Sequence, residues 1–129
     1  MRQIMDLESL IVSSVFYFNI FLVDATFAHA ALINRINLIE QLPKHFSTEI
    51  HCVVSKCVLN EAKNLGPQLN GASKILSQFQ LWGCAHKTPI SASECIEHII
   101  GDSNHNHLFL ASQDQDLKKR LSKKSILYL

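Results

Sequence analysis

Four short apolar runs along the chain predict the strands of a sheet. The first of them, Phe18–Val23, is largely apolar without polar alternation and ends at Asp24. A run of this kind is typical of a strand that is covered on both faces. The four predicted strands are Phe18–Val23, Glu49–Val54, Leu108–Ala111 and Ile126–Leu129.

Helical patterns fill the intervals between these runs. Apolar residues recur at helical spacing from Phe27 to Leu42, and we expect Pro43 to end that helix. Serines that can cap a helix precede two of the later segments, and Gly66-Pro67 is a stop signal. The later helices are expected at 55–65, 69–80, 91–100 and 115–123, with a loop at 81–89. Strands that alternate with helices predict parallel crossovers and an open α/β sheet.

Composition is that of one globular domain. The chain has 129 residues, of which 47% are hydrophobic and 18% charged. The net charge of +1 conceals an asymmetry, because residues 1–117 carry 7 Lys and Arg against 11 Asp and Glu. Five basic residues then follow within seven positions: Lys118, Lys119, Arg120, Lys123 and Lys124. Such a cluster is either a solvated helix face or a surface that meets phosphates.

The apolar run Leu10–Val23 raises the question of cellular compartment. Its 14 residues are fewer than the roughly 20 that a transmembrane helix needs. Arg2 and the sequence Ala28-His29-Ala30 are features of a signal peptide, whereas Asp6 and Glu8 make the leading region acidic. Secretion therefore stays an open alternative, in which the four cysteines would form disulfides.

Three cysteines and a histidine form the main candidate metal site. Cys57, Cys84, His86 and Cys95 offer three thiolates and one imidazole, which complete a tetrahedral zinc site. Their spacing lacks the tight Cys-x-x-Cys pairs of common zinc fingers, and cysteines are also frequent as plain buried residues. Cys52 lies within a predicted strand, and we interpret it as a core residue. His98, one helical turn after Cys95, is a secondary candidate ligand.

Four carboxylates form a second candidate site. Asp24 and Asp114 follow the first and third predicted strands, and ligands of open α/β sheets bind at the carboxyl ends of strands. Glu61 lies on the helix predicted after the second strand, and Glu94 on the helix predicted before the third. Together these acids would make an oxygen-lined pocket for Mg²⁺ or Mn²⁺ of the kind used in phosphodiester chemistry. Taken singly, each acid is equally typical of a solvated or helix-capping residue.

Several segments of the chain resemble a known family. FLVDATF, LPKHF, SKCVLNEAKNLG, GCAHKTPISASEC and LASQDQDLKKRL are similar in order and spacing to the Utp-twenty-three family of ribosomal-RNA-processing proteins, a sister of the Fcf-one family. The resemblance covers residues 20–129 and implies a PIN-like three-layer α/β fold with a mostly parallel open sheet. Residues 1–19 do not resemble the basic leading segment of the family, and the sequence ends before the Lys-rich tail that is usual there.

The resemblance implies a set of functional expectations. The family is nucleolar, belongs to the small-subunit processome, and is linked with pre-rRNA and a box H/ACA small nucleolar RNA. Its structural zinc site falls on Cys57, Cys84, His86 and Cys95. The acids of active PIN nucleases match Asp24, Glu61 and Asp114, but Ser93 and Glu94 stand where the sister family has two aspartates.

We therefore expect an RNA-binding protein with a degenerate nuclease site. The basic residues 118–124 would contact RNA phosphates. The partners would be RNA and processome proteins, with no membrane and no small-molecule substrate. The alternative is an active endoribonuclease that uses Asp24, Glu61, Glu94 and Asp114 with Mg²⁺ or Mn²⁺.

Overall fold

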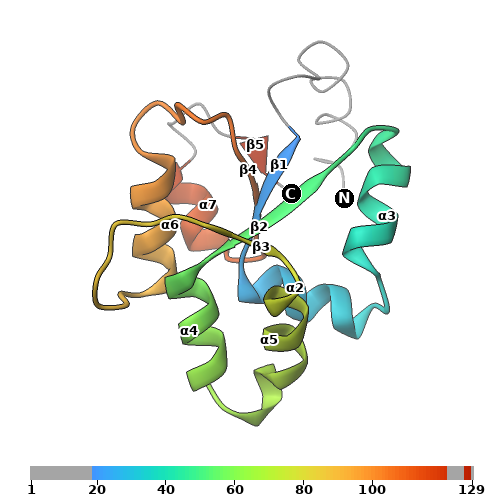
Figure 1. Ribbon diagram of the computed structural model, residues 1–129, viewed down its shortest axis with the longest axis horizontal. Helices are drawn as coiled ribbons and strands as arrows, with labels where there is room; N and C mark the ends of the chain where they lie inside the picture. The colour runs from blue at the N-terminus through green and yellow to red at the C-terminus, as the bar shows by residue number, and fades with distance from the viewer. Residues whose placement is uncertain (1–18, 122–126, 129) are drawn as a thin grey trace.

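A five-stranded parallel sheet forms the centre of the computed structural model, which describes residues 19–121 and 127–128 (Figure 1). The strand order is β3-β2-β1-β4-β5. β1 is therefore the central strand, with β2 and then β3 on one side of it and β4 and then β5 on the other. The strands are β1 (Ile20–Val23), β2 (His51–Ser55), β3 (Gln80–Trp82), β4 (Phe109–Ala111) and β5 (Leu127–Tyr128).

The central strand β1 explains why the sheet is buried on both faces. Phe21, Leu22 and Val23 are all fully buried, although neighbouring side chains point to opposite faces. Phe21 pairs in register with Phe109 of β4, and their rings stack with centroids 4.7 Å apart. The ring of Phe46 packs edge-on against the ring of Phe21, with the two ring centroids 5.6 Å apart. Helices must therefore cover both faces, as expected for a parallel sheet.

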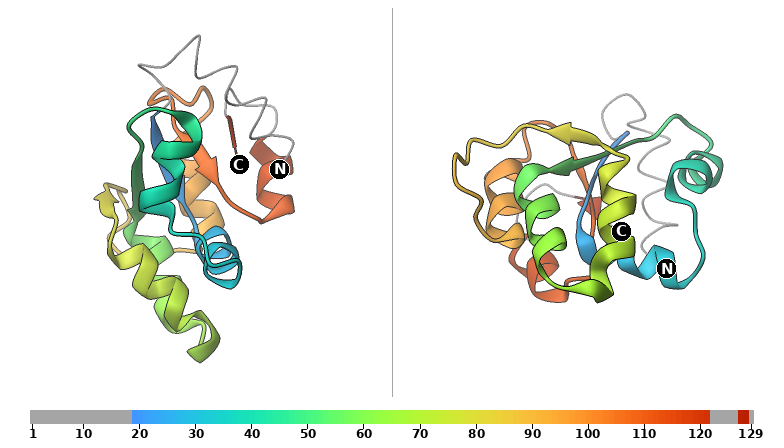
Figure 2. Two further views of the ribbon diagram at one scale, coloured as in Figure 1. Left: turned by 90° about the vertical axis from the view of Figure 1, so that its right-hand side faces the viewer. Right: turned by 60° about the horizontal axis from the view of Figure 1, so that its bottom comes forward.

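Six α-helices and one 3₁₀ turn provide this cover within the described residues. In Figure 1, α4 and α5 lie together at the bottom, α6 and α7 on the left, and α3 on the right, and Figure 2 shows the same arrangement from two further sides. The helices are α2 (Ala25–Ile33), α3 (Leu38–Phe46), α4 (Lys56–Asn64), η1 (Pro67–Leu69), α5 (Asn70–Ser77), α6 (Ala92–Ile100) and α7 (Gln115–Leu121).

The single helix predicted from Phe27 to Pro43 is wrong. Two helices occupy this stretch, because Arg35 turns into the left-handed region (φ 56°) after α2 and Asn37 caps α3. Pro43 lies inside α3 rather than ending it. Its missing N–H removes one helical hydrogen bond, but α3 still buries Leu38, Leu42 and Phe46 at helical spacing. Packing of that apolar stripe outweighs the local cost of proline.

Strand β3 was missed from the sequence, where 81–89 was expected to be a loop. Gln80–Trp82 pairs in parallel with Val53–Ser55 of β2 and forms one edge of the sheet. Its burial is low, as Gln80 and Leu81 are exposed. A strand of three residues with an exposed outer edge carries too little hydrophobic periodicity to be recognised.

None of the described helices is both long enough and apolar enough to cross a membrane.

Candidate metal centre and acidic site

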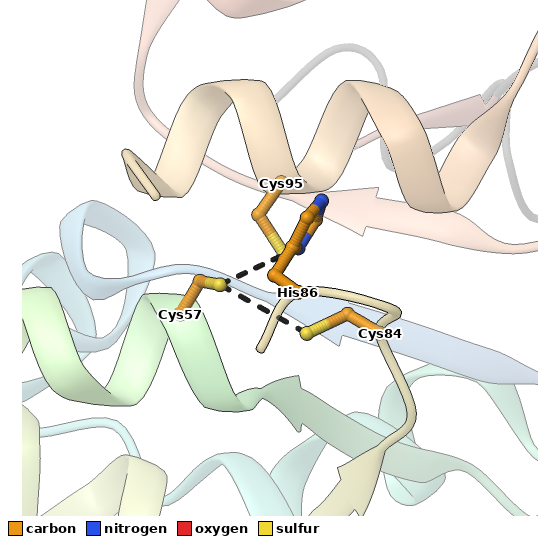
Figure 3. A group of neighbouring side chains, drawn as sticks. All are labelled: Cys57, Cys84, His86 and Cys95. Carbon is orange, nitrogen blue, oxygen red and sulfur yellow. Dashed lines mark hydrogen bonds between the residues drawn. The ribbon is translucent and has the colours of Figure 1, made fainter. Parts of the chain in front are cut away.

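Three separate parts of the chain bring the cysteine and histidine side chains together. Cys57 lies in the first turn of α4, Cys95 lies in α6, and Cys84 and His86 lie in the loop between β3 and α6. Figure 3 shows the four side chains pointing toward a common centre. Among the described residues, these four form the group of three or more Cys, His, Asp or Glu that could hold a metal ion.

The spacing of the ligand atoms fits a tetrahedral ion. Zinc–sulfur bonds of about 2.3 Å place two thiolate sulfurs about 3.8 Å apart at the tetrahedral angle, and a sulfur and an imidazole nitrogen about 3.6 Å apart. The Sγ atoms of Cys57 and Cys84 are 3.9 Å apart, and Cys57 Sγ is 3.5 Å from His86 Nδ1. All four ligand atoms lie within 4.8 Å of one another. The cluster can therefore hold a metal ion of this geometry.

His98 supports the histidine ligand and is not part of the ligand set. The Nε2 atom of His86 lies 2.8 Å from His98 Nδ1. If His86 binds a metal through Nδ1, its proton must be on Nε2, so His86 donates this hydrogen bond and His98 accepts it. A metal-binding histidine usually has such a partner on its other ring nitrogen. Cys95 and His98 are three residues apart on α6, so one helix face provides both a ligand and this partner.

Ser55 gives the buried thiols a second support. Its Oγ accepts a hydrogen bond from Val58 N at the start of α4 and lies 3.3 Å from Cys95 Sγ, which donates to it. Burial raises the pKa of Cys95 to about 12 despite this contact. Burial also opposes ionisation of Cys84, but hydrogen bonds from the backbone and ring of His86 outweigh it and lower the pKa to about 7. As pH rises, Cys84 therefore ionises before Cys95.

All four thiols of the chain are free in the structure. Cys52 is partly buried in β2 and packs against the hydrophobic core, as interpreted from the sequence. Burial raises the pKa of its thiol to about 11, so it stays protonated at neutral pH. Cys52 is accordingly a core residue outside the metal-binding group.

Asp24 occupies the switch point of the sheet, between the carboxyl ends of β1 and β4. It caps α2 and is 5% exposed. One carboxylate oxygen accepts from Phe27 N at 3.0 Å and from Thr26 Oγ1 at 2.7 Å, and the other accepts from Ser112 Oγ. Burial raises the pKa of Asp24 against these hydrogen bonds, and the charge of Asp114 adds to the effect. The hydroxyl partners were not identified from the sequence, where nothing marks Thr26 and Ser112 apart from other residues at strand ends.

The other three acids have separate local partners. Asp114 caps α7 by accepting hydrogen bonds from Asp116 N and Leu117 N. Glu61 accepts from Ala92 N at the start of α6, at 3.2 Å. Glu94 is exposed at the start of the same helix. Asp114 is close enough to Asp24 for its charge to raise the pKa of Asp24, whereas Glu61 and Glu94 lie on α4 and α6.

The basic residues of the last helix do not form one uniform face. Lys118 is 7% exposed, and burial lowers its pKa while the charge of Asp24 acts in the opposite direction. Lys119 and Arg120 are exposed, and Arg120 Nε donates to Glu97 Oε1 at 2.8 Å. The predicted contacts of Lys123 and Lys124 lie outside the described residues.

Comparison with known proteins identifies the family. The Fcf1 family model matches residues 44–128. The chain belongs to the Fcf1 family. The matched region of this Fcf1-family chain includes the cysteine–histidine cluster together with Glu61, Glu94 and Asp114, and it begins after Asp24.

The fold of the Fcf1-family chain is that of a PIN domain. It is similar to a solved structure described as the PIN domain endonuclease Utp24, with a TM-score of 0.71 and 25% sequence identity. The match covers 85% of this chain and 84% of the other. The expected PIN-like α/β fold with a parallel sheet is therefore confirmed.

Proposed function

We propose that the cysteine–histidine cluster is a structural zinc site. Three thiolates and one imidazole are a donor set that zinc prefers, and four protein ligands leave no open position for catalysis. Two of the ligands, Cys57 and Cys95, are buried. A bound ion would join α4, α6 and the loop between β3 and α6, and its binding would displace the proton that burial holds on the thiol of Cys95.

We propose that the protein is an RNA-binding factor in ribosomal-RNA processing that does not cut RNA. It belongs, in this proposal, to the Utp-twenty-three branch of the family and acts in the nucleolus with the small-subunit processome, pre-rRNA and a box H/ACA small nucleolar RNA. The observation that supports the non-catalytic part is that Asp24, Glu61 and Asp114 are each engaged by hydrogen bonds from nearby groups of the protein. Glu61 is bonded to the backbone of α6, and Glu94 is exposed.

Lys118 supports the same proposal. Metal-dependent phosphodiester cleavage needs carboxylates whose oxygens are free to bind divalent cations. Both oxygens of Asp24 already accept hydrogen bonds from Thr26, Phe27 and Ser112, and the buried ammonium of Lys118 is close enough to interact with its charge. The carboxylate of Asp24 is thus already engaged by groups of the protein itself.

An active endoribonuclease is the second candidate. The similar solved structure is described as an endonuclease, and Asp24, Glu61 and Asp114 are retained here. In that case Asp24 and Asp114 would hold Mg²⁺ or Mn²⁺ at the switch point of the sheet.

Incubation of the protein with labelled single-stranded RNA and Mn²⁺ distinguishes the two candidates. We expect binding without cleavage by the natural sequence. Cleavage that disappears in Asp24→Asn/Asp114→Asn would establish the nuclease instead.

The affinity of the protein for RNA should fall with rising salt, and Lys119→Ala should lower the slope of log affinity against log salt by about 0.7 if Lys119 contacts one phosphate. An affinity that does not change with salt would refute the phosphate contacts.

A further inference from the structure

An exposed apolar corner joins α2 to α3. The described residues include six exposed large hydrophobic side chains, and four of them lie within the eight positions from Leu32 to Ile39. Their exposed fractions are 45% for Leu32, 65% for Ile33, 38% for Ile36 and 53% for Ile39. Scattered single exposed aliphatic residues are normal on a surface, but a contiguous group marks an interaction site. We call these four residues the corner patch.

The corner patch borders a hollow of about 330 Å³. Its walls come from both sides of the corner and from α5, and include Leu32, Ile36, Ile39, Ile75 and Phe79. A recess with aliphatic and aromatic walls can receive one large apolar side chain from another molecule, as at the anchor positions of protein interfaces.

Arg35 lies at the centre of this corner and is the only charged residue among those that line the hollow. It occupies the left-handed position after α2, where Arg35 N donates to Leu32 O and Ile36 N to Ala31 O. Glycine is the usual residue at this position, because a side chain makes the left-handed conformation costly. Within the described part of the chain, the guanidinium of Arg35 forms no hydrogen bond or ion pair. An arginine is therefore kept at an unfavourable position without a partner of its own.

We propose that the corner patch binds a protein segment that carries an apolar anchor and a carboxylate. The anchor would enter the hollow, and the carboxylate would pair with Arg35, which can bind it through two parallel hydrogen bonds. RNA matches this surface poorly, because the four residues of the corner patch are aliphatic and Phe79 of the hollow is only 8% exposed, so little aromatic ring surface is open to an unpaired base. An amphipathic helix would supply both groups at helical spacing.

Selection of a displayed library of helical peptides against the full chain tests the proposal. Peptides enriched on the natural sequence should share a large apolar residue and an Asp or Glu. Selection against Arg35→Glu should enrich Lys or Arg at that position instead. The enriched acidic peptide should bind at least tenfold more weakly to Ile33→Ser/Ile36→Ser, whereas Leu65→Ser, an exposed leucine away from the corner, should bind it unchanged.

Arg35→Gly separates the role of the side chain from folding. Glycine relieves the left-handed backbone, so this variant should melt at a higher temperature and yet bind the acidic peptide more weakly. The proposal is wrong if the enriched peptides show the same charge preference on Arg35→Glu, or if no peptide depends on the corner patch. A dimer that dissociates on Ile33→Ser would assign the patch to a second copy of this chain. Loss of RNA affinity in the same variant would assign it to RNA.

Discussion

Replacement of Asp24 by Asn is expected to stabilise the protein at neutral pH. Asp24 is 5% exposed, and burial destabilises the charged form of its carboxylate, which is the main reason that its pKa is raised. Asn caps helices about as well as Asp, and its side-chain oxygen can accept from Phe27 N and Thr26 Oγ1 as the carboxylate does. The Ser112 hydroxyl can turn and accept from the new amide. The substitution therefore removes a buried charge and keeps the hydrogen bonds.

The expected gain is about 1 kcal/mol at pH 7, which lies within the usual range of about 0.5–2 kcal/mol for stabilising single substitutions. In a domain of this size, a gain of about 1 kcal/mol raises the melting temperature by about 4 °C. Loss of the attraction to Lys118 reduces the gain. Asp24→Ala should instead be less stable, because it removes the helix cap and leaves the hydroxyls of Thr26 and Ser112 without this acceptor.

The pH dependence follows from the raised pKa of Asp24 in the folded state. The folded chain keeps the proton to a higher pH than the unfolded chain, so the natural sequence loses stability as pH rises from the unfolded pKa of about 4 through the folded pKa. The advantage of Asp24→Asn should therefore be small below about pH 4 and grow toward pH 7.

Urea unfolding of both proteins across this pH range measures the difference. Asp116→Asn, an exposed acid in the first turn of α7, is the control and should change stability by less than about 0.5 kcal/mol. If Asp24→Asn is less stable than the natural sequence at pH 7, or if the gap does not depend on pH, then hydrogen bonds and Lys118 stabilise the charged carboxylate more than burial penalises it.

Three further substitutions test the packing and the metal centre. His98→Ala should weaken zinc affinity about tenfold or more, measured by competition with a chelator, because His98 holds the ring of His86. The control His105→Ala changes a histidine in an exposed loop and should leave the zinc affinity unchanged. Equal zinc affinities of the two variants would show that His98 does not orient His86. Gly71→Ala places a Cβ 2.3 Å from Leu32 Cδ2, so the better helix propensity of alanine should be offset by this clash and stability should stay close to that of the natural sequence. In a Leu32→Ala background the clash is absent, and the same substitution should stabilise the protein by about 1 kcal/mol. An equal effect of Gly71→Ala in both backgrounds would contradict this contact. Ser55→Ala should lower the free energy of unfolding by about 1 kcal/mol through loss of the α4 cap, and no loss would show that the cap is dispensable.

The sequence predicted four of the five described strands, including the edge strand β5, and missed the other edge strand, β3. β1, β2 and β4 each contain two or more buried apolar residues in a row, and a continuous apolar run of this kind can be recognised from the residue types. Helix α6 was also predicted, because Ser91 lies at the capping distance from Glu94. Strand β3 depends on pairing with β2 and could not be read from its own residues.

The two candidate sites differ in how far sequence patterns determine them. The ligand group of Cys57, Cys84, His86 and Cys95 is brought together, as their residue types and the family resemblance predicted. Carboxylates have many roles. Glu61 contacts the start of α6, and no pattern in the sequence distinguishes that contact from a place in an acidic pocket.

In the proposed function a zinc ion joins α4, α6 and the loop between β3 and α6, and elemental analysis of the purified full chain tests this most directly. We predict close to one zinc per chain, together with thiol titration in which the three site cysteines react only after a chelator is added. Removal of the zinc should also lower the melting temperature. A protein without metal, with its site cysteines freely reactive and its melting temperature unchanged by chelator, would contradict the account.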